Sequence, residues 1–110
     1  MDIVYVLKAL SDEKRMEIIR LLSKKKYCVR ALSRQLNISE SAVSQHIQVL
    51  KKANLLKIGD KNGYNIHYEV NGAVLKQISE ELKYLSDSIL SVRECGGNCK
   101  EKKNEKERIG

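Results

Sequence analysis

Three cysteines are the residues of this chain best suited to metal or redox chemistry. Cys95 and Cys99 flank Gly96-Gly97-Asn98, and the two glycines would let the backbone fold so that both sulfur atoms face one point. These thiolates, with Cys28 as a third ligand, could form the sulfur site that arsenite, cadmium or zinc prefers. The same pair could instead close a disulfide or polysulfide under oxidant or sulfide. A third interpretation is two incidental thiols in a tail.

The other chemistry-bearing residues are less indicative of a reactive site. Cys28 taken alone is more typical of a small buried apolar residue than of a ligand. We expect His46 to be packed or bonded at the flank of an apolar helix stripe, and His67 to be exposed on a strand. The sequence shows no nucleophile–base pair, phosphate-binding glycine loop or carboxylate pair, and therefore does not predict an enzyme.

The segment Ser39–Ala53 has the pattern of a DNA-reading helix. Val43, Ile47 and Leu50 recur at i, i+4 and i+7 and predict an inward apolar stripe. The opposite face carries only side chains that can donate a hydrogen bond: Ser41, Ser44, Gln45, Gln48 and Lys52. Gln can bond adenine in the major groove, Ser can bond a base edge or a phosphate, and Lys neutralises phosphate.

An ordinary solvated helix face is the alternative interpretation of these polar residues. Glu40 is the only acidic residue of the segment, and it lies in the first turn, where the helix dipole favours a negative charge. The absence of acids from the rest of the face favours DNA binding. The sequence therefore predicts that Ser39–Ala53 enters the major groove of duplex DNA.

Three shorter helices should precede this one. The apolar spacing predicts a first helix over about Asp2–Leu10, with an inward face made of Ile3, Val6, Leu7 and Leu10. It predicts a second helix that Ser11 or Asp12 caps and that ends near Leu22. A third runs from about Val29 to Leu36. The residues Asn37-Ile38-Ser39 join it to the reading helix by a tight turn, which is typical of a helix-turn-helix.

A β-hairpin is predicted directly after the reading helix. Leu55–Ile58 and Tyr64–Val70 have strand patterns, and the segment Gly59–Gly63 between them is rich in turn formers. Such a hairpin occupies the place of a wing, on which Lys57 and Lys61 would present positive charge to DNA. The expected fold is therefore α+β: a winged helix-turn-helix of about five helices and a two-stranded wing.

A long last helix is expected from about Asn71 to Glu94. Its apolar residues follow an alternating spacing of three and four: Leu75, Ile78, Leu82, Leu85, Ile89 and Val92. A seam of this length usually meets another helix, and we expect a homodimer through the terminal helices. The alternative is a helix packed against the core of its own chain.

Length and composition are consistent with a cytoplasmic DNA-binding protein. The 110 residues allow one domain, which we place at 1–94, followed by a cysteine-containing, charged tail at 95–110 that we expect to be disordered. The net charge of +7 attracts polyanions such as nucleic acid. There is neither an apolar run that could span a membrane nor the basic start of a signal peptide, so we expect a cytoplasmic protein with reduced cysteines and no membrane partner.

Several blocks of the sequence, in this order, resemble the ArsR/SmtB family. The blocks are Lys8–Arg15, Ile18–Leu22, Leu36–Leu50, Asn54–Leu56 and Gly63–Tyr68, and the resemblance covers about residues 3–92. It implies a dimeric bacterial repressor that leaves its operator DNA when a metal ion, metalloid or thiol-reactive signal binds. The family usually has Pro where Glu13 stands, a departure that a helix start tolerates.

The metal sites that the resemblance implies are incomplete in this chain. The family's Cys-x-Cys site would begin at Cys28, but Arg30 stands in place of its second cysteine. The zinc site on the last helix of other members uses Asp, His and Glu, and the matching stretch 72–88 has no His. The resemblance thus implies a thiolate-bound metal or metalloid inducer, for which Cys95 and Cys99 are the ligands left. The competing interpretation of the whole chain is a winged-helix protein–protein module.

Overall fold

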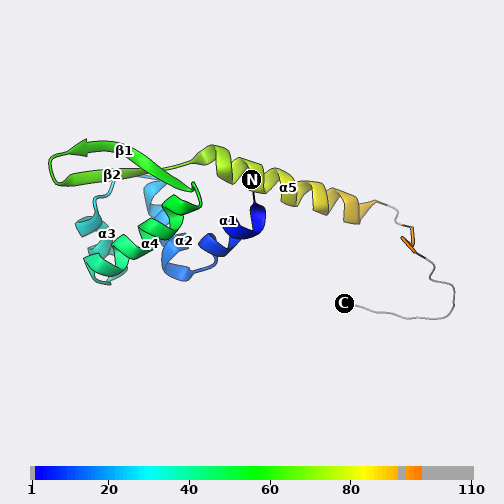
Figure 1. The fold of residues 1–110 in the computed structure, drawn as a ribbon, viewed down its shortest axis with the longest axis horizontal. Coiled ribbons are helices and arrows are strands. Elements are labelled where there is room, and N and C mark those ends of the chain that lie inside the picture. Colours follow the sequence, from blue (N-terminus) through cyan, green and yellow to red (C-terminus); the bar gives the residue numbers. More distant parts are fainter. Residues whose placement is uncertain (1, 92–93, 98–110) are drawn as a thin grey trace. The chain divides into compact units, whose positions relative to one another are not determined.

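The computed structural model describes residues 2–91 and 94–97, and the chain divides into two units, Met1–Ser79 and Glu80–Gly110. Within the described residues the order of elements is α1 (Ile3–Leu10), α2 (Glu13–Leu22), α3 (Val29–Leu36), α4 (Glu40–Lys52), β1 (Leu56–Asn62), β2 (Asn65–Val70) and α5 (Gly72–Leu90) (Figure 1). The predicted winged helix-turn-helix is therefore confirmed. In the described part of the chain, no helix combines the length and the apolarity that crossing a membrane requires.

The core of the first unit is aliphatic and is centred on α4. The fully buried large side chains come from α2, α3, α4 and the segment before β1: Ile18, Leu32, Val43, Ile47, Leu50 and Leu55. Burying a side chain of this size contributes about 1.5–3 kcal/mol. The predicted inward stripe of α4 is confirmed, because its three members are at most 1% exposed.

Helix α1 is capped by Asp2 and presents a narrower apolar face than expected. The Asp2 carboxylate accepts hydrogen bonds from the backbone N–H groups of Val4 and Tyr5. Val6 and Ala9 are buried, whereas Leu7, which we expected to point inward, is 37% exposed. The helix rotates by about 100° per residue, so a face centred on Val6 and Ala9 turns Leu7 outward.

The turn between α3 and α4 is fixed by Ser33 and Asn37. Asn37 adopts the left-handed conformation (φ 56°, ψ 46°), which ends α3. The N–H groups of Asn37 and Ile38 donate to the Ser33 carbonyl, and the Ser33 hydroxyl donates to the Ile38 carbonyl over 2.6 Å. Ser39 then caps α4 by accepting from the N–H of Ala42.

The wing is longer and its turn tighter than the sequence predicts. The strands continue to Asn62 and from Asn65, which pair with each other, so the expected five-residue turn Gly59–Gly63 is wrong. The chain reverses instead over Gly63 and Tyr64, because Gly63 takes up a φ of +63°. Gly59 lies at an irregularity between Ile58 and Asp60 inside β1, as in a β-bulge.

Helix α5 is shorter than expected and belongs to both units. It ends at Leu90 rather than near Glu94, and Val92, the last expected seam residue, lies outside the described residues. Near this end the Ser88 and Ser91 hydroxyls donate to the carbonyls of residues 84 and 88, an arrangement that competes with helix continuation.

The seam of α5 changes character along its length. Within the first unit Ile78 is buried and Leu75 is half-buried against the core, as the intramolecular alternative predicts. Farther on, the seam residues are exposed: Leu82 at 48%, Leu85 at 55% and Ile89 at 60%. An apolar row therefore continues past the part of the helix that contributes to the core.

Asn37 should be sensitive to side-chain shape, because its φ is positive. We expect Asn37→Val to lower the free energy of unfolding by roughly 1–2 kcal/mol, the cost of a left-handed residue with a branched Cβ. Asn37→Gly, which has no Cβ, is the matched control and should stay close to the wild type. Urea unfolding followed by circular dichroism measures both, and a Val variant as stable as the wild type would contradict the assignment.

Candidate nucleic-acid interface

The outward face of α4 presents the polar side chains that the sequence assigns to DNA reading. Because the stripe of Val43, Ile47 and Leu50 is buried, the opposite side of the helix faces solvent. All five predicted contact residues are exposed: Ser41, Ser44, Gln45, Gln48 and Lys52. Within residues 2–91 and 94–97 none of these side chains makes a hydrogen bond or an ion pair, so their donors are available to a ligand.

A polar cluster ties α4 to the corner between α1 and α2. The Arg15 Nε donates to the Ala9 carbonyl at the end of α1 over 2.6 Å, and its Nη1 lies 3.4 Å from the Nδ1 of His46 on α4. The Asp12 carboxylate, which caps α2, lies 3.9 Å from the same ring nitrogen. His46 therefore orients α4 from its flank, in agreement with the expectation that it is a packed histidine.

The charge of Asp12 is stabilised where it caps α2. The N–H of Arg15 donates to the Asp12 carboxylate over 3.0 Å and lowers the pKa of that carboxyl below its ordinary value. The charges of Arg15 and His46 act in the same direction, and partial burial opposes them. Asp12 is thus held ionised, and its negative charge lies close to Arg15 and His46 beside α4.

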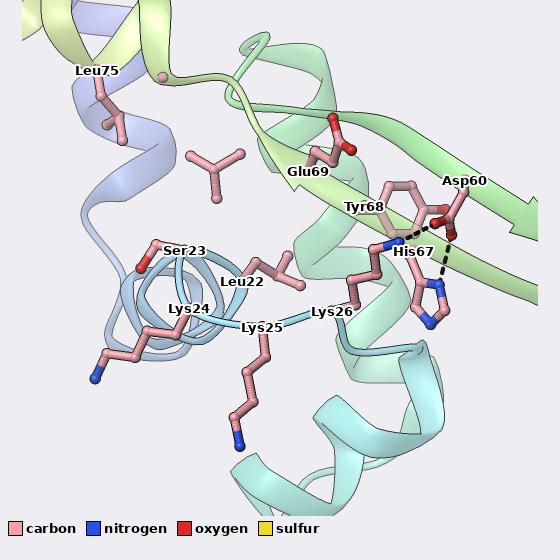
Figure 2. Close-up of a pocket in the computed structure, with 12 residues that line it drawn as sticks. Leu22, Ser23, Lys24, Lys25, Lys26, Asp60, His67, Tyr68, Glu69 and Leu75 are labelled. Carbon is pink, nitrogen blue, oxygen red and sulfur yellow. Dashed lines mark hydrogen bonds and ion pairs between the residues drawn. The ribbon is translucent and has the colours of Figure 1, made fainter.

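The wing is fastened to the loop between α2 and α3 through Asp60. The Asp60 carboxylate lies 2.6 Å from the Nζ of Lys26 and 2.7 Å from the Nδ1 of His67 (Figure 2). The hydrogen bond from Lys26, followed by the one from His67, holds the pKa of Asp60 below its usual range, and Asp60 in turn raises the pKa of Lys26. His67 is therefore half-buried and engaged, not simply exposed as the sequence suggested.

The two wing lysines leave the hairpin on opposite faces. Lys57 pairs across the strands with Glu69, and Lys61 pairs with Ile66. Directly opposed residues share a face, and the irregularity between Ile58 and Asp60 shifts the alternation by one position. Both lysines are exposed. A regular strand would have placed them on the same side, as their spacing of four suggests.

A second contact joins the wing to the end of α4. The Nζ of Lys51 lies 5.7 Å from the centre of the Tyr68 ring, a cation–π arrangement. Tyr68 is half-buried and packs against the core from β2. Together with Asp60, this contact fixes the base of the wing relative to α4.

The three predicted thiol ligands belong to different units of the chain, and one of them lies outside the described residues. Cys28 is the half-buried N-terminal cap residue of α3, and its side chain makes no capping hydrogen bond. Cys95 belongs to the second unit, is exposed, and has its Sγ 3.6 Å from the Gly97 carbonyl, whereas Cys99 lies outside the described residues. Among the described residues, no three side chains of His, Cys, Asp or Glu form a metal-binding group. The thiolate site stays a prediction.

Comparison with known proteins matches this chain to winged-helix regulators. The family model described as "Bacterial regulatory protein, arsR family" matches residues 12–57. The chain is 34% identical over 83 residues to the arsenical resistance operon repressor of Staphylococcus aureus, covering 76% of this chain and 79% of the relative. The chain belongs to the ArsR family. It is thus a DNA-binding transcriptional regulator.

Two further matches support the ArsR assignment. The transcriptional activator HlyU of Vibrio cholerae is 32% identical over 82 residues, with 74% of this chain and 75% of the relative covered. The solved structure of an ArsR-like transcriptional regulator from Rhodococcus sp. RHA1 superimposes with a TM-score of 0.70 at 29% identity, over 79% of this chain and 81% of that one. The matched relatives thus include both a repressor and an activator.

The contact between Lys26 and Asp60 predicts a pH dependence of the wing. A lowered pKa means that this contact stabilises the fold above the ordinary Asp pKa and is lost as the pH falls through the lowered value. We expect Lys26→Gln to raise the pKa of Asp60 toward its ordinary value, since it removes the largest cause of the shift. Carboxyl carbon NMR shifts measured against pH report this change. Lys52→Gln is the control, and equal Asp60 titration in the two variants would refute the contact.

Proposed function

We propose that this ArsR-family protein is a homodimeric repressor that reads duplex operator DNA with α4. The observation that carries the proposal is the row of unengaged donors on α4, which the buried stripe turns outward. Gln45 and Gln48 are the candidates for base contacts, and Ser41, Ser44 and Lys52 for contacts to base edges and phosphates. Lys57 and Lys61 would add phosphate contacts from the two faces of the wing.

The second half of α5 is the proposed dimer contact. Exposed aliphatic residues continue its seam through Leu82, Leu85 and Ile89, and packing them against the same helix of a second copy would remove them from water. Two copies would place their α4 helices in successive major grooves about 34 Å apart, on an inverted repeat. In this proposal residues 1–94 act as the DNA-binding and dimerisation domain.

The proposed inducer is a thiophilic metal or metalloid ion of the arsenite, cadmium or zinc class. Cys95 and Cys99 follow the dimer helix closely and offer two thiolates, and Cys28 is the third candidate ligand. Relatives of this chain are named as arsenical resistance operon repressors and as a cadmium resistance regulatory protein homolog. Ion binding would favour an arrangement of the two reading helices that fits the operator poorly. The alternative signal is oxidative: an oxidant that takes up the electrons closes a disulfide between Cys95 and Cys99, or, when sulfide is also present, a polysulfide.

Binding to DNA should show two separable contributions. On a duplex recovered by in vitro selection, affinity should fall steeply with salt, because phosphate contacts release counterions. Gln45→Ala should reduce the discrimination between bases at one operator position by about 1–3 kcal/mol. Lys52→Ala should weaken binding to all duplexes alike and lower the slope of log affinity against log salt concentration by about one. Fluorescence anisotropy measures both. Salt-insensitive binding would rule out this interface.

The inducer can be identified by titration of the protein–DNA complex. We expect arsenite, cadmium or zinc to release the wild-type protein from its selected duplex. A Cys95→Ser, Cys99→Ser variant should bind that duplex equally well and stay bound when the ion is added. If no ion releases the wild type but an oxidant does, alone or together with sulfide, and the double variant resists it, the redox alternative holds. Identical responses of the two proteins would exclude these cysteines as the sensor.

A further inference from the structure

A cleft separates the tip of the wing from the starts of α3 and α4. It has a volume of about 670 Å³ and is lined by the first residues of α3, by Glu40 of α4 and by the hairpin turn around Tyr64. In Figure 1 the turn of the hairpin lies on the same side of the first unit as α3. The cleft is contained within the first unit, and its lining residue Glu40 directly precedes Ser41 in α4.

The walls of the cleft are suited to a chain of negative charges. Arg30, Asn62, Tyr64 and Asn65 line it with hydrogen-bond donors, and the N-terminal ends of α3 and α4 add partial positive charge. Glu40 is the acidic residue among the lining side chains, and its Oε2 lies 3.7 Å from the Nε of Arg30. The Arg30 guanidinium is therefore already paired with an anion in the free protein.

The pair of Arg30 and Glu40 is easily exchanged. Both side chains are largely exposed, at 70% and 56%, so water screens their attraction. Exposed ion pairs of this kind contribute little to stability. A phosphate offers Arg30 oxygen atoms for two parallel hydrogen bonds, which is a stronger arrangement than one contact at 3.7 Å. A phosphate could therefore replace Glu40 as the partner of Arg30.

We infer that this cleft receives a stretch of the DNA sugar–phosphate backbone, and that Arg30 exchanges Glu40 for a phosphate when the duplex binds. The inference rests on the proposed DNA binding by α4. A duplex that contacts Ser41 passes the start of α4, where Glu40 and the cleft lie. Glu40 then opposes the approach of every duplex alike, because it repels phosphate and occupies Arg30.

Tyr64 is one of the residues that line the cleft. It stands in the two-residue turn of the wing and is 104% exposed, so it makes no packing contribution to the fold. At this place its ring can lie along a deoxyribose and its hydroxyl can reach a phosphate. The sequence predicts Tyr64 as the first residue of a strand, whereas it lies in the turn before β2, and only the position of the turn shows its exposure.

The test measures, by fluorescence anisotropy, the affinity of cleft variants for one selected duplex over a range of salt concentrations. The slope of affinity against salt reports the number of phosphate contacts. Arg30→Gln should bind about tenfold more weakly, with a salt slope smaller by about one. Glu40→Gln should bind severalfold more tightly, and this gain should shrink when Arg30 is also replaced by Gln, because the two residues act as a pair.

A second Arg–Glu pair provides the matched control. Arg20 and Glu17 form an exposed pair 3.3 Å apart on α2, outside the lining of the cleft. Arg20→Gln and Glu17→Gln change the net charge by the same amounts and should leave the salt slope close to that of the wild type. Equal effects of the two pairs would show that only net charge matters and would overturn the inference.

Tyr64 supplies a measurement that cannot be confused with misfolding. Tyr64→Ala should retain the thermal stability of the wild type and lose severalfold affinity. Tyr64→Phe, which keeps the ring and lacks only the hydroxyl, should lose less affinity than Tyr64→Ala. If the wild type binds its selected duplex but Arg30→Gln keeps the full affinity and salt slope, the backbone does not enter the cleft, and DNA reading by α4 still stands. If selection with the wild type recovers no duplex, both the inference and the proposed function are wrong.

Discussion

Burial of one stripe of α4 is the constraint on which the rest of this molecule depends. Val43, Ile47 and Leu50 enter the centre of the core, and this fixes the rotation of the helix about its own axis. Any change in that rotation would expose aliphatic surface, at a cost of about 25 cal/mol for each Å². The polar face of α4 is therefore presented to solvent as a consequence of core packing.

Contacts from four other elements restrain α4 along its length. The turn built on Ser33 sets where the helix begins, and Arg15 and His46 fasten its middle to the corner of α1 and α2. Lys51 meets the ring of Tyr68 at its end. The helix thus has a fixed start, flank and end, so that the position of its outward face is set before any ligand arrives.

The acidic residues that surround α4 are neutralised locally. Asp12 accepts from the backbone N–H of Arg15 and lies 3.9 Å from His46. Asp60 is paired with Lys26 and His67, and Glu40 with Arg30. The first two pairings hold parts of the fold together, whereas the exposed pair of Arg30 and Glu40 lies in an open cleft. Because these acidic side chains already have cationic or hydrogen-bonding partners, the net charge of +7 remains available to attract a polyanion.

The sequence alone determined the features that depend on local spacing. The stripe of α4, the start of α2 at one of the two cap candidates Ser11 and Asp12, and the helix-turn-helix followed by a hairpin all follow from spacing within a few residues, and they agree with the structure. The exposed reading face followed from the same periodicity. The proposed roles of its side chains rest on that pattern and on the family.

Only the tertiary structure decided the features that depend on strand register in the wing and on contacts between residues far apart in the sequence. The turn at Gly63 and Tyr64 and the opposite faces of Lys57 and Lys61 depend on which residues pair across the hairpin, and an irregularity of one residue reverses every face beyond it. Lys26 and Asp60 lie 34 positions apart, and no local pattern links them. Arg30 and Glu40 likewise meet only because the turn between α3 and α4 brings the two helix starts together.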